Sequence, residues 1–178
     1  MLSKHQFQLL LNLKNKTGKT NQRAISEELR FSLGTVNKLI QEAEQQEWIT
    51  SEYELTEKGL KTLEPYRVEN AIIMAAGMST RFAPLSYETP KGLLVVKGER
   101  LIEREIKQLR EAGIQKITVV VGYMKEKMFY LADKFGVEIV VNEDYYRYNN
   151  CSSLMLVRKQ LGNTYICSSD NYFVENPF

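Results

Sequence analysis

Two basic side chains and a run of small residues stand close together in residues 71–94. Residues 71–74 are apolar and predict a buried strand, and alanine, glycine, serine and threonine follow it directly. A strand that ends in small residues can turn sharply, so that its backbone N–H groups approach a bulky anion. Arg81 and Lys91 lie on the same loop and can neutralise phosphate oxygens, arginine as a fork and lysine as a point charge. This stretch therefore predicts phosphate chemistry.

The loop resembles the signature of nucleotidyltransferases that join a nucleoside triphosphate to a phosphorylated acceptor. That signature contains a glycine, a small hydroxylated pair, an arginine, a proline and a Pro-Lys pair. Here it reads Gly77-Met78-Ser79-Thr80-Arg81, Pro84-Leu85 and Pro90-Lys91. The continuation through residues 91–99 looks most like the CTP:phosphocholine cytidylyltransferase branch, and the resemblance extends from about residue 70 to residue 178.

The resemblance implies roles for individual residues. Arg81 would hold the β- and γ-phosphates and stabilise the leaving pyrophosphate. Lys91 would bridge the α-phosphate and the acceptor phosphate, and Asp170 would hold Mg²⁺. Residues 148–153 resemble the segment that approaches the nucleoside in this branch. The nucleotide-binding residues implied in this way are Ala75, Ala76, Gly77, Ser79, Thr80, Asn150 and Ser152.

Some of these residues also have structural interpretations. Asp170 could instead be a helix-capping or turn aspartate. Tyr145, Tyr146 and Tyr148 could stack on a ligand or cover the sheet edge, and we favour cover. We interpret Cys151 as a buried packing residue, like Cys167.

Strands and helices are expected to alternate after residue 70. The pattern predicts helices ending at Gly113 and spanning residues 125–135 and 154–161, with a polar loop over 143–153. It predicts further strands over residues 114–121, 137–141 and 164–167. Strict alternation favours a Rossmann-like, doubly wound parallel α/β sheet. The carboxyl ends of its strands share one edge, so the loop after residue 74 and Asp170 are expected to meet there.

Nucleotidyl transfer requires positioning and charge neutralisation, because the acceptor phosphate is already a nucleophile. Mg²⁺ suits this task, since it binds through one or two carboxylates together with phosphates and water. We therefore expect CMP transfer from CTP to phosphocholine or a similar acceptor, with Mg²⁺ as cofactor. One alternative is transfer to a sugar 1-phosphate from UTP or dTTP. Another is a transcriptional regulator whose α/β part senses a nucleotide.

The first 65 residues predict a separate small domain, with the second domain over residues 66–178. Helical patterns begin near His5 and after the caps Asn21 and Ser32. Residues 48–50 and 53–56 predict two short strands of a wing, and Thr56 caps a last helix with Leu60 and Leu63 inward. This order resembles the winged helix-turn-helix family. The exposed side of its third helix, with the possible DNA-binding residues Thr35, Asn37, Lys38 and Gln41, could enter a major groove. The domain could instead be a protein-interaction or sensory module.

Composition restricts the class of protein. The 178 residues carry a net charge of +2, which is too small to indicate nucleic acid or membrane binding by itself. Two cysteines and one histidine cannot form a disulfide framework or a usual zinc site. Neither a signal peptide nor a membrane-spanning run is evident, so we expect a cytoplasmic protein. Related catalytic domains are longer, so we interpret the sequence as the front part of a longer protein.

Overall fold

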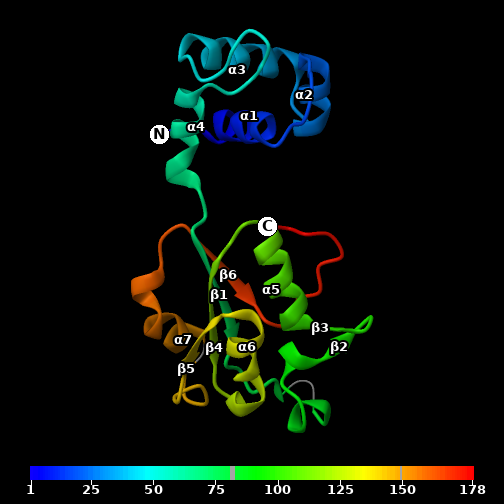
Figure 1. Ribbon diagram of the computed structural model, residues 1–178, viewed down its shortest axis with the longest axis vertical. Helices are drawn as coiled ribbons and strands as arrows, with labels where there is room; N and C mark the ends of the chain where they lie inside the picture. The colour runs from blue at the N-terminus through cyan, green and yellow to red at the C-terminus, as the bar shows by residue number, and fades with distance from the viewer. Residues whose placement is uncertain (81–82, 149) are drawn as a thin grey trace. The chain divides into compact units, whose positions relative to one another are not determined.

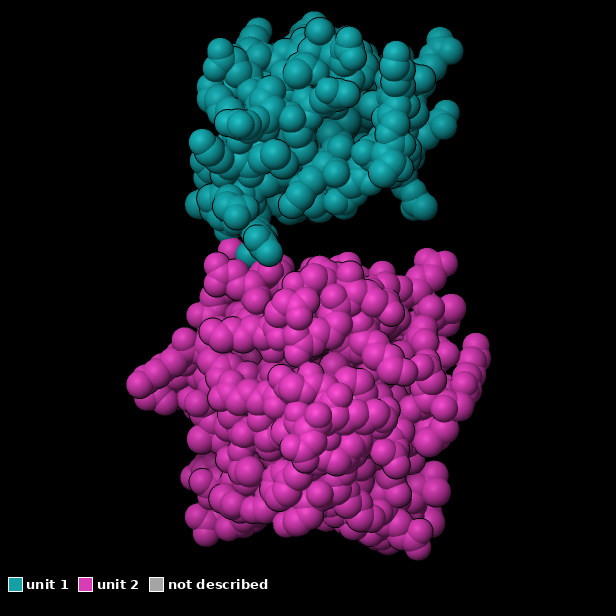
Figure 2. Space-filling view, viewed as in Figure 1, with its two compact units in different colours: residues 1–67 teal, residues 68–178 magenta. Residues whose placement is uncertain are grey.

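The computed structural model describes residues 1–80, 83–148 and 150–178 (Figure 1). The chain forms two compact units, unit 1 (Met1–Arg67) and unit 2 (Val68–Phe178), which Figure 2 shows in different colours. The sequence places the joint after residue 65, within a short 3₁₀ turn, η1 (Glu64–Tyr66), that follows the last helix of unit 1.

Unit 1 is a bundle of four helices. These are α1 (Lys4–Lys14), α2 (Gln22–Leu29), α3 (Leu33–Gln45) and α4 (Glu57–Leu63). The side chains of Asn21, Ser32 and Thr56 accept hydrogen bonds from backbone N–H groups of the following helix, which confirms the three predicted caps. The helices enclose a core of buried aliphatic residues that includes Leu10, Ile25, Val36, Leu39, Ile40 and Leu63.

The wing differs from the prediction. Instead of two strands, the described chain has one isolated antiparallel bridge between Ile49 and Leu55. The connection between them is a tight turn in which Tyr53 adopts the left-handed region, with φ 64°. So short a hairpin leaves no room for a longer ladder.

The expected inward position of Leu60 is also wrong. Its side chain is 45% exposed, whereas that of Leu63 is 6% exposed. The helix turns Gly59 and Leu63, which are four residues apart, toward the core, so Leu60 lies outside that face.

Unit 2 is built on a parallel sheet, as predicted. Its strands are β1 (Asn70–Ala75), β4 (Lys116–Val121), β5 (Glu138–Val141) and β6 (Thr164–Ser168), in the order β5-β4-β1-β6. Every pairing between these strands is parallel. The strand order reverses between β1 and β6, which makes this point the topological switch of the sheet. A separate small ribbon pairs β2 (Val95–Val96) with β3 (Glu99–Arg100).

Helices cover both faces of the sheet (Figure 1). Ala71 and Ile73 of β1 belong to the main core, with residues of α5 (Leu101–Glu111) and α6 (Tyr130–Phe135). Ile72 faces the other way and packs with Val157, which follows α7 (Asn150–Leu156). Because successive side chains of a strand alternate in direction, β1 is buried on both faces. This confirms the predicted doubly wound architecture.

Several helix bounds in unit 2 differ from the prediction. The stretch 125–135 is divided into a 3₁₀ turn, η5 (Lys125–Met128), and the short helix α6. Helix α7 begins at Asn150, inside the stretch predicted to be a loop, and a 3₁₀ turn, η6 (Arg158–Gln160), replaces the end of the predicted helix 154–161. Cys151 is exposed, so its predicted burial is wrong, whereas Cys167 is buried. Because α7 is short and lies at the surface, periodicity gave little guidance there.

Among the described residues, no helix combines the length and the apolar character that a membrane span needs.

Two glycines of unit 1 allow a matched test of packing. A Cβ at Gly59 would lie 2.1 Å from the carbonyl oxygen of Trp48, whereas a Cβ at Gly34 in α3 would meet nothing within 4 Å. We expect Gly59→Ala to lower the free energy of unfolding of unit 1 by about 2 kcal/mol or more, because the backbone must move. Gly34→Ala should instead raise it by about 0.5–1 kcal/mol.

Denaturant unfolding followed by Trp48 fluorescence measures this difference, because Trp48 is the single tryptophan and lies in unit 1. Equal midpoints for the two variants would contradict the packing described for α4.

Candidate functional site

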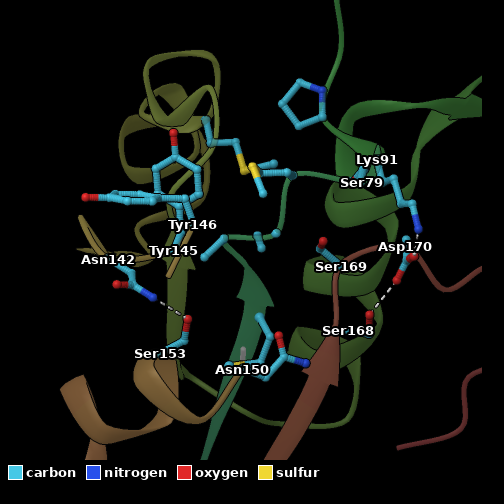
Figure 3. Close-up of a pocket in the computed structure, with 18 of the residues that line it drawn as sticks. Ser79, Lys91, Asn142, Tyr145, Tyr146, Asn150, Ser153, Ser168, Ser169 and Asp170 are labelled. Atoms are coloured by element: carbon cyan, nitrogen blue, oxygen red, sulfur yellow. Dashed lines mark hydrogen bonds and ion pairs between the residues drawn. The ribbon is translucent and has the colours of Figure 1, made fainter. Parts of the chain in front are cut away.

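A cavity of about 450 Å³ lies at the carboxyl ends of the strands of unit 2 (Figure 3). The loop after β1 forms one part of its lining, and the residues that end β6 form another. The tyrosine-rich segment after β5 and the start of α7 complete it. The lining includes Ala75, Ala76, Gly77, Ser79, Thr80, Lys91, Asn142, Asn150, Ser153, Ser168, Ser169 and Asp170.

Strand register brings the first and last of these segments together. Met74 of β1 is paired with Ser168 of β6, and the backbone N–H of Ser169 donates to the carbonyl of Met74 at 3.4 Å. The two strands therefore leave the sheet side by side and in the same direction. The small-residue loop and Asp170, far apart in the sequence, reach the same cavity for this reason.

Lys91 and Asp170 form an ion pair at the cavity. The Lys91 ammonium lies 3.3 Å from a carboxylate oxygen of Asp170, and the side chains are 23% and 34% exposed. Burial opposes ionisation of Asp170, but hydrogen bonds from the Ser168 hydroxyl and the Lys91 ammonium outweigh it and lower the pKa of the carboxyl. The aspartate is therefore held as an anion. Asp170 does occupy a turn, and its side chain is directed to the Lys91 ammonium.

The residue after Lys91 must be small. A Cβ at Gly92 would lie 3.0 Å from the Cβ of Ser169 and 3.1 Å from its carbonyl oxygen. Gly92 thus lets the 3₁₀ turn η4 (Lys91–Leu93) approach the end of β6. This close approach sets Lys91 beside Asp170.

Asn142 joins the end of β5 to the start of α7. It is 2% exposed, and its amide nitrogen donates to the hydroxyl oxygens of Ser152 and Ser153, at 2.9 Å each. Its carbonyl oxygen accepts from the backbone N–H of Asp144 at 3.0 Å. This residue was missed by the sequence analysis. The available signal was a polar amide directly after a strand, at the edge where the other site residues were expected.

The sequence-predicted nucleotide residues mostly line this cavity. Ala75, Ala76, Gly77, Ser79, Thr80 and Asn150 do so together with Lys91 and Asp170. Ser152 is not part of the lining among the described residues, since its hydroxyl contacts Asn142. Arg81, the other predicted catalytic residue, lies outside the described residues.

The tyrosines do more than cover the sheet edge. Tyr145, Tyr146 and Tyr148 all line the cavity. Tyr145 packs against Tyr123 and Tyr146 with ring centroids 6.4 and 5.7 Å apart. Figure 3 shows Tyr145 and Tyr146 across the cavity from Lys91 and Asp170. The site thus has a charged side and an aromatic side.

A second carboxyl is buried beneath the charged side. Glu105 of α5 is 1% exposed, and within the described part of the chain neither of its oxygens has a hydrogen bond of good geometry. Burial, and then the charge of Asp170, raise the pKa of Glu105 to about 8. Burial likewise raises the pKa of the neighbouring Cys167 thiol to about 12. At neutral pH, Glu105 is therefore predominantly protonated while Asp170 is ionised.

The donor set fits a magnesium ion that shares its coordination with phosphates. No cluster of three or more metal-ligating side chains occurs among the residues that the structure describes. A closed protein cage is thus not formed by them. Mg²⁺ commonly binds through one or two carboxylates and completes its shell with phosphates and water. Asp170, ionised and at the cavity, is suited to that mode of binding.

In unit 1, the predicted DNA-binding residues lie along α3. Asn37, Lys38 and Gln41 are exposed, and Thr35 is half-buried. Lys38 has Glu42 at 4.0 Å, and the Asn37 amide donates to the side chain of Gln22 at 3.3 Å. This face of α3 is therefore accessible, but its charges are largely balanced locally.

A parallel sheet whose switch point carries a small-residue loop, a lysine and an aspartate is typical of nucleotide-binding α/β domains. Residues 71–176, more than half of the chain, match the family model of the MobA-like NTP transferase domain. The chain belongs to this family. Residues 9–78 match the model of a wHTH-PRTase associated domain, in agreement with the winged-helix resemblance of unit 1.

Curated relatives give a more detailed comparison. The chain is 47% identical over 108 residues to a choline-phosphate cytidylyltransferase of Streptococcus pneumoniae, covering 61% of this chain and 47% of that protein. It is 47% identical over 104 residues to a 2-aminoethylphosphonate cytidylyltransferase of Lancefieldella rimae, covering 57% of this chain and 42% of that one. The chain thus spans about half the length of these curated relatives.

A solved structure of CTP:phosphocholine cytidylyltransferase from Streptococcus pneumoniae superposes with a TM-score of 0.61 and 46% identity. The match covers 63% of this chain and 49% of that chain. The nucleotidyltransferase fold of unit 2 is established by this likeness and by the family match.

The buried carboxyl gives a pH prediction. The unfolded chain releases the Glu105 proton near pH 4.5, whereas the folded chain keeps it until about pH 8. The free energy of unfolding therefore falls as pH rises through this interval. Glu105→Gln, which cannot ionise, should remove this slope and make unit 2 more stable than the wild type at pH 8, by an amount on the order of 3 kcal/mol.

Urea unfolding followed by circular dichroism at about pH 5 and pH 8 measures the difference. Glu111→Gln, on the exposed side of the same helix, serves as control and should leave the slope unchanged. A variant whose stability follows the wild-type pH dependence would show that Glu105 ionises normally in the folded protein.

Proposed function

We propose that the protein is a cytidylyltransferase that transfers CMP from CTP to phosphocholine or a closely similar phosphorylated amine, releasing pyrophosphate. The observation that carries the proposal is the meeting of Lys91 and Asp170, 79 positions apart, beside the small-residue loop. The choice of CTP and of an amine-bearing acceptor is supported by the two relatives at 47% identity, whose names specify such substrates.

The reaction presents a problem of charge. An acceptor phosphate oxygen must attack the α-phosphorus of a polyanion, forming a new P–O bond as the bond to the β-phosphate oxygen breaks. The Lys91 ammonium lines the cavity and would neutralise oxygens on the two reacting phosphates. Backbone groups of residues 75–77 would hold the nucleotide, and Arg81 is proposed to hold the departing pyrophosphate. The cavity then acts by orienting two anions against their repulsion.

Asp170 is the residue that would hold Mg²⁺ in this site. When bound, the cation would neutralise charge on the triphosphate. Asp170 remains ionised because Ser168 and Lys91 lower its pKa. With the cation held by Asp170, the Lys91 ammonium would no longer be needed to balance the aspartate and would contact the phosphates instead.

The aromatic side of the cavity can receive the nucleoside. Tyr145 and Tyr146 present ring faces and edges for stacking on a base. Asn150, at the start of α7, adds an amide that can both donate and accept hydrogen bonds. Asn142 keeps this helix start in place through its two serine contacts.

DNA binding is not part of this proposal. Residues 1–67 carry ten lysines and arginines and nine glutamates, so counter-ion release would contribute little affinity. The wing is a single bridge in the described chain, and Lys38 lies near Glu42.

Turnover is tested by incubating the 178-residue protein with CTP, Mg²⁺ and phosphocholine and measuring pyrophosphate. We expect release that falls by about 10²-fold or more in Lys91→Ala and in Arg81→Ala, because charge neutralisation is lost. Lys116→Ala is the matched control, since Lys116 is exposed and starts β4 at the opposite end of the strand. Release from sugar 1-phosphates with UTP or dTTP, but not from phosphocholine with CTP, would favour the sugar-nucleotide alternative and reject the present proposal.

Equilibrium binding tests the same site without turnover. Asp170→Asn should weaken the binding of CTP in the presence of Mg²⁺ by about tenfold, and should change binding much less in the presence of EDTA. Isothermal titration calorimetry of the variant and the wild type provides the comparison. If CTP affinity in Mg²⁺ is the same for both proteins, Asp170 does not hold the cation.

A further inference from the structure

Unit 1 contains a cavity of its own, of about 650 Å³, that neither the winged-helix resemblance nor the proposed transfer reaction accounts for. It lies within residues 13–60, between the loop that joins α1 to α2, the turn of the wing and the start of α4. Its volume is in the range of small-molecule sites in proteins. We call it the unit 1 pocket; the residues that line it are Leu13, Lys14, Lys16, Gly18, Lys19, Thr20, Glu52, Tyr53, Glu54, Leu55 and Leu60.

One segment of the pocket is cationic. Lys14 ends α1, and Lys16 and Lys19 lie in the loop that follows it. Lys16 is already neutralised by Glu28, at 2.7 Å. Throughout the described chain, Lys14 and Lys19 have no carboxylate within 4.0 Å. Two ammonium groups with uncompensated charge therefore border one cavity.

A buried hydroxyl lies beside these cations. The Oγ1 atom of Thr20 is shielded from solvent, and it has no hydrogen-bond partner among the described residues. The two ammonium groups are donors suited to phosphate oxygens, and the shielded Thr20 hydroxyl is not counted among the ligand contacts.

The other polar segment is anionic and aromatic. Glu52 and Glu54 flank Tyr53 in the wing turn, and neither carboxylate has an ion-pair partner in the described part of the chain. Leu13, Leu55 and Leu60 add apolar surface. Carboxylates, an aromatic ring and aliphatic side chains together suit an amine or a quaternary ammonium group. The two segments thus offer charges of opposite sign that do not neutralise each other.

We propose that the unit 1 pocket binds a small zwitterion in which a phosphate or phosphonate group and a cationic amine are joined by a short alkyl chain. The phosphate would contact Lys14 and Lys19, and the amine would contact the wing turn. The choice of this class over a simple anion rests on the two glutamates, and its identity with the acceptor of the transfer reaction rests on the proposed function. Unit 1 would then act as a sensor of the acceptor.

The test uses the 178-residue protein labelled with ¹⁵N and titrated with phosphocholine in the absence of CTP. We expect saturable shifts of the amide resonances of Gly18, Thr20 and Tyr53. Lys14→Gln with Lys19→Gln should weaken this binding by about tenfold or more, since two charge contacts to the phosphate are lost. Lys4→Gln with Lys61→Gln removes two exposed lysines outside the pocket and should change it by less than about twofold.

A second pair of variants keeps the result interpretable. Glu52→Gln with Glu54→Gln should weaken phosphocholine binding but leave binding of inorganic phosphate unchanged. Resonances of unit 2 in each spectrum report whether the rest of the protein is folded. The proposal is overturned if no saturable shifts occur in the unit 1 pocket, if the lysine variant binds like its control, or if inorganic phosphate binds as tightly as phosphocholine.

Failure of the sensor and failure of the transfer reaction are distinguishable. Lys91→Ala should lower pyrophosphate release by about 10²-fold or more yet leave the shifts of Gly18, Thr20 and Tyr53 intact. Shifts of these amides that disappear in Lys91→Ala would place the ligand in unit 2 and overturn the proposed pocket. Normal turnover without shifts in unit 1 would overturn the pocket while leaving the transferase proposal in place.

Discussion

The parallel pairing of β1 with β6 is the constraint on which the site depends. Their ladder sets Met74 beside Ser168, so the chain leaves both strands at the same level of the sheet. The apolar residues of β1 are buried on alternate faces, and a slip of one residue would turn each of them to the wrong side. The packing that stabilises the sheet therefore brings the loop after β1 and Asp170 to the same edge, where the close approach of Gly92 to Ser169 sets Lys91 beside Asp170.

The environment of unit 2 separates two carboxyl groups into different protonation states. Asp170 has a lysine and a hydroxyl as partners and stays ionised. Glu105 has lost its hydration without gaining such partners, and the charge of Asp170 opposes its ionisation. A site that must attract phosphates benefits from this arrangement, because only one negative charge is placed near them. The neutral carboxyl fills buried space at a cost in stability that grows with pH.

Much of the fold could be predicted from local patterns. Apolar runs followed by small or polar residues correctly predicted the parallel strands. The residue types of Asn21, Ser32 and Thr56 correctly predicted where three helices begin. The meeting of Lys91 with Asp170 followed from topology, since both segments come after parallel strands. These inferences succeeded because the periodicity and the capping chemistry act over short stretches of chain.

Other features depend on contacts that a sequence pattern does not encode. The prediction of two wing strands was wrong, because the single bridge between Ile49 and Leu55 is too short to be told from a turn by its sequence pattern. The start of α7 at Asn150 is stabilised by Asn142, a tertiary partner that precedes it in a different element. From the sequence, Glu105 looks like an ordinary exposed helix glutamate. Only its burial in the structure shows that its pKa is raised.

The central claim is that a nucleoside triphosphate and a divalent cation bind at the switch point of unit 2. A crystal structure of the protein with CTP and Mn²⁺, recorded at a wavelength where manganese scatters anomalously, tests it most directly, because Mn²⁺ shares the oxygen-ligand preference of Mg²⁺. We predict triphosphate density between the loop of residues 75–80 and Lys91, with an anomalous peak at the carboxylate of Asp170. Triphosphate density elsewhere, or a manganese peak away from Asp170, would contradict the account.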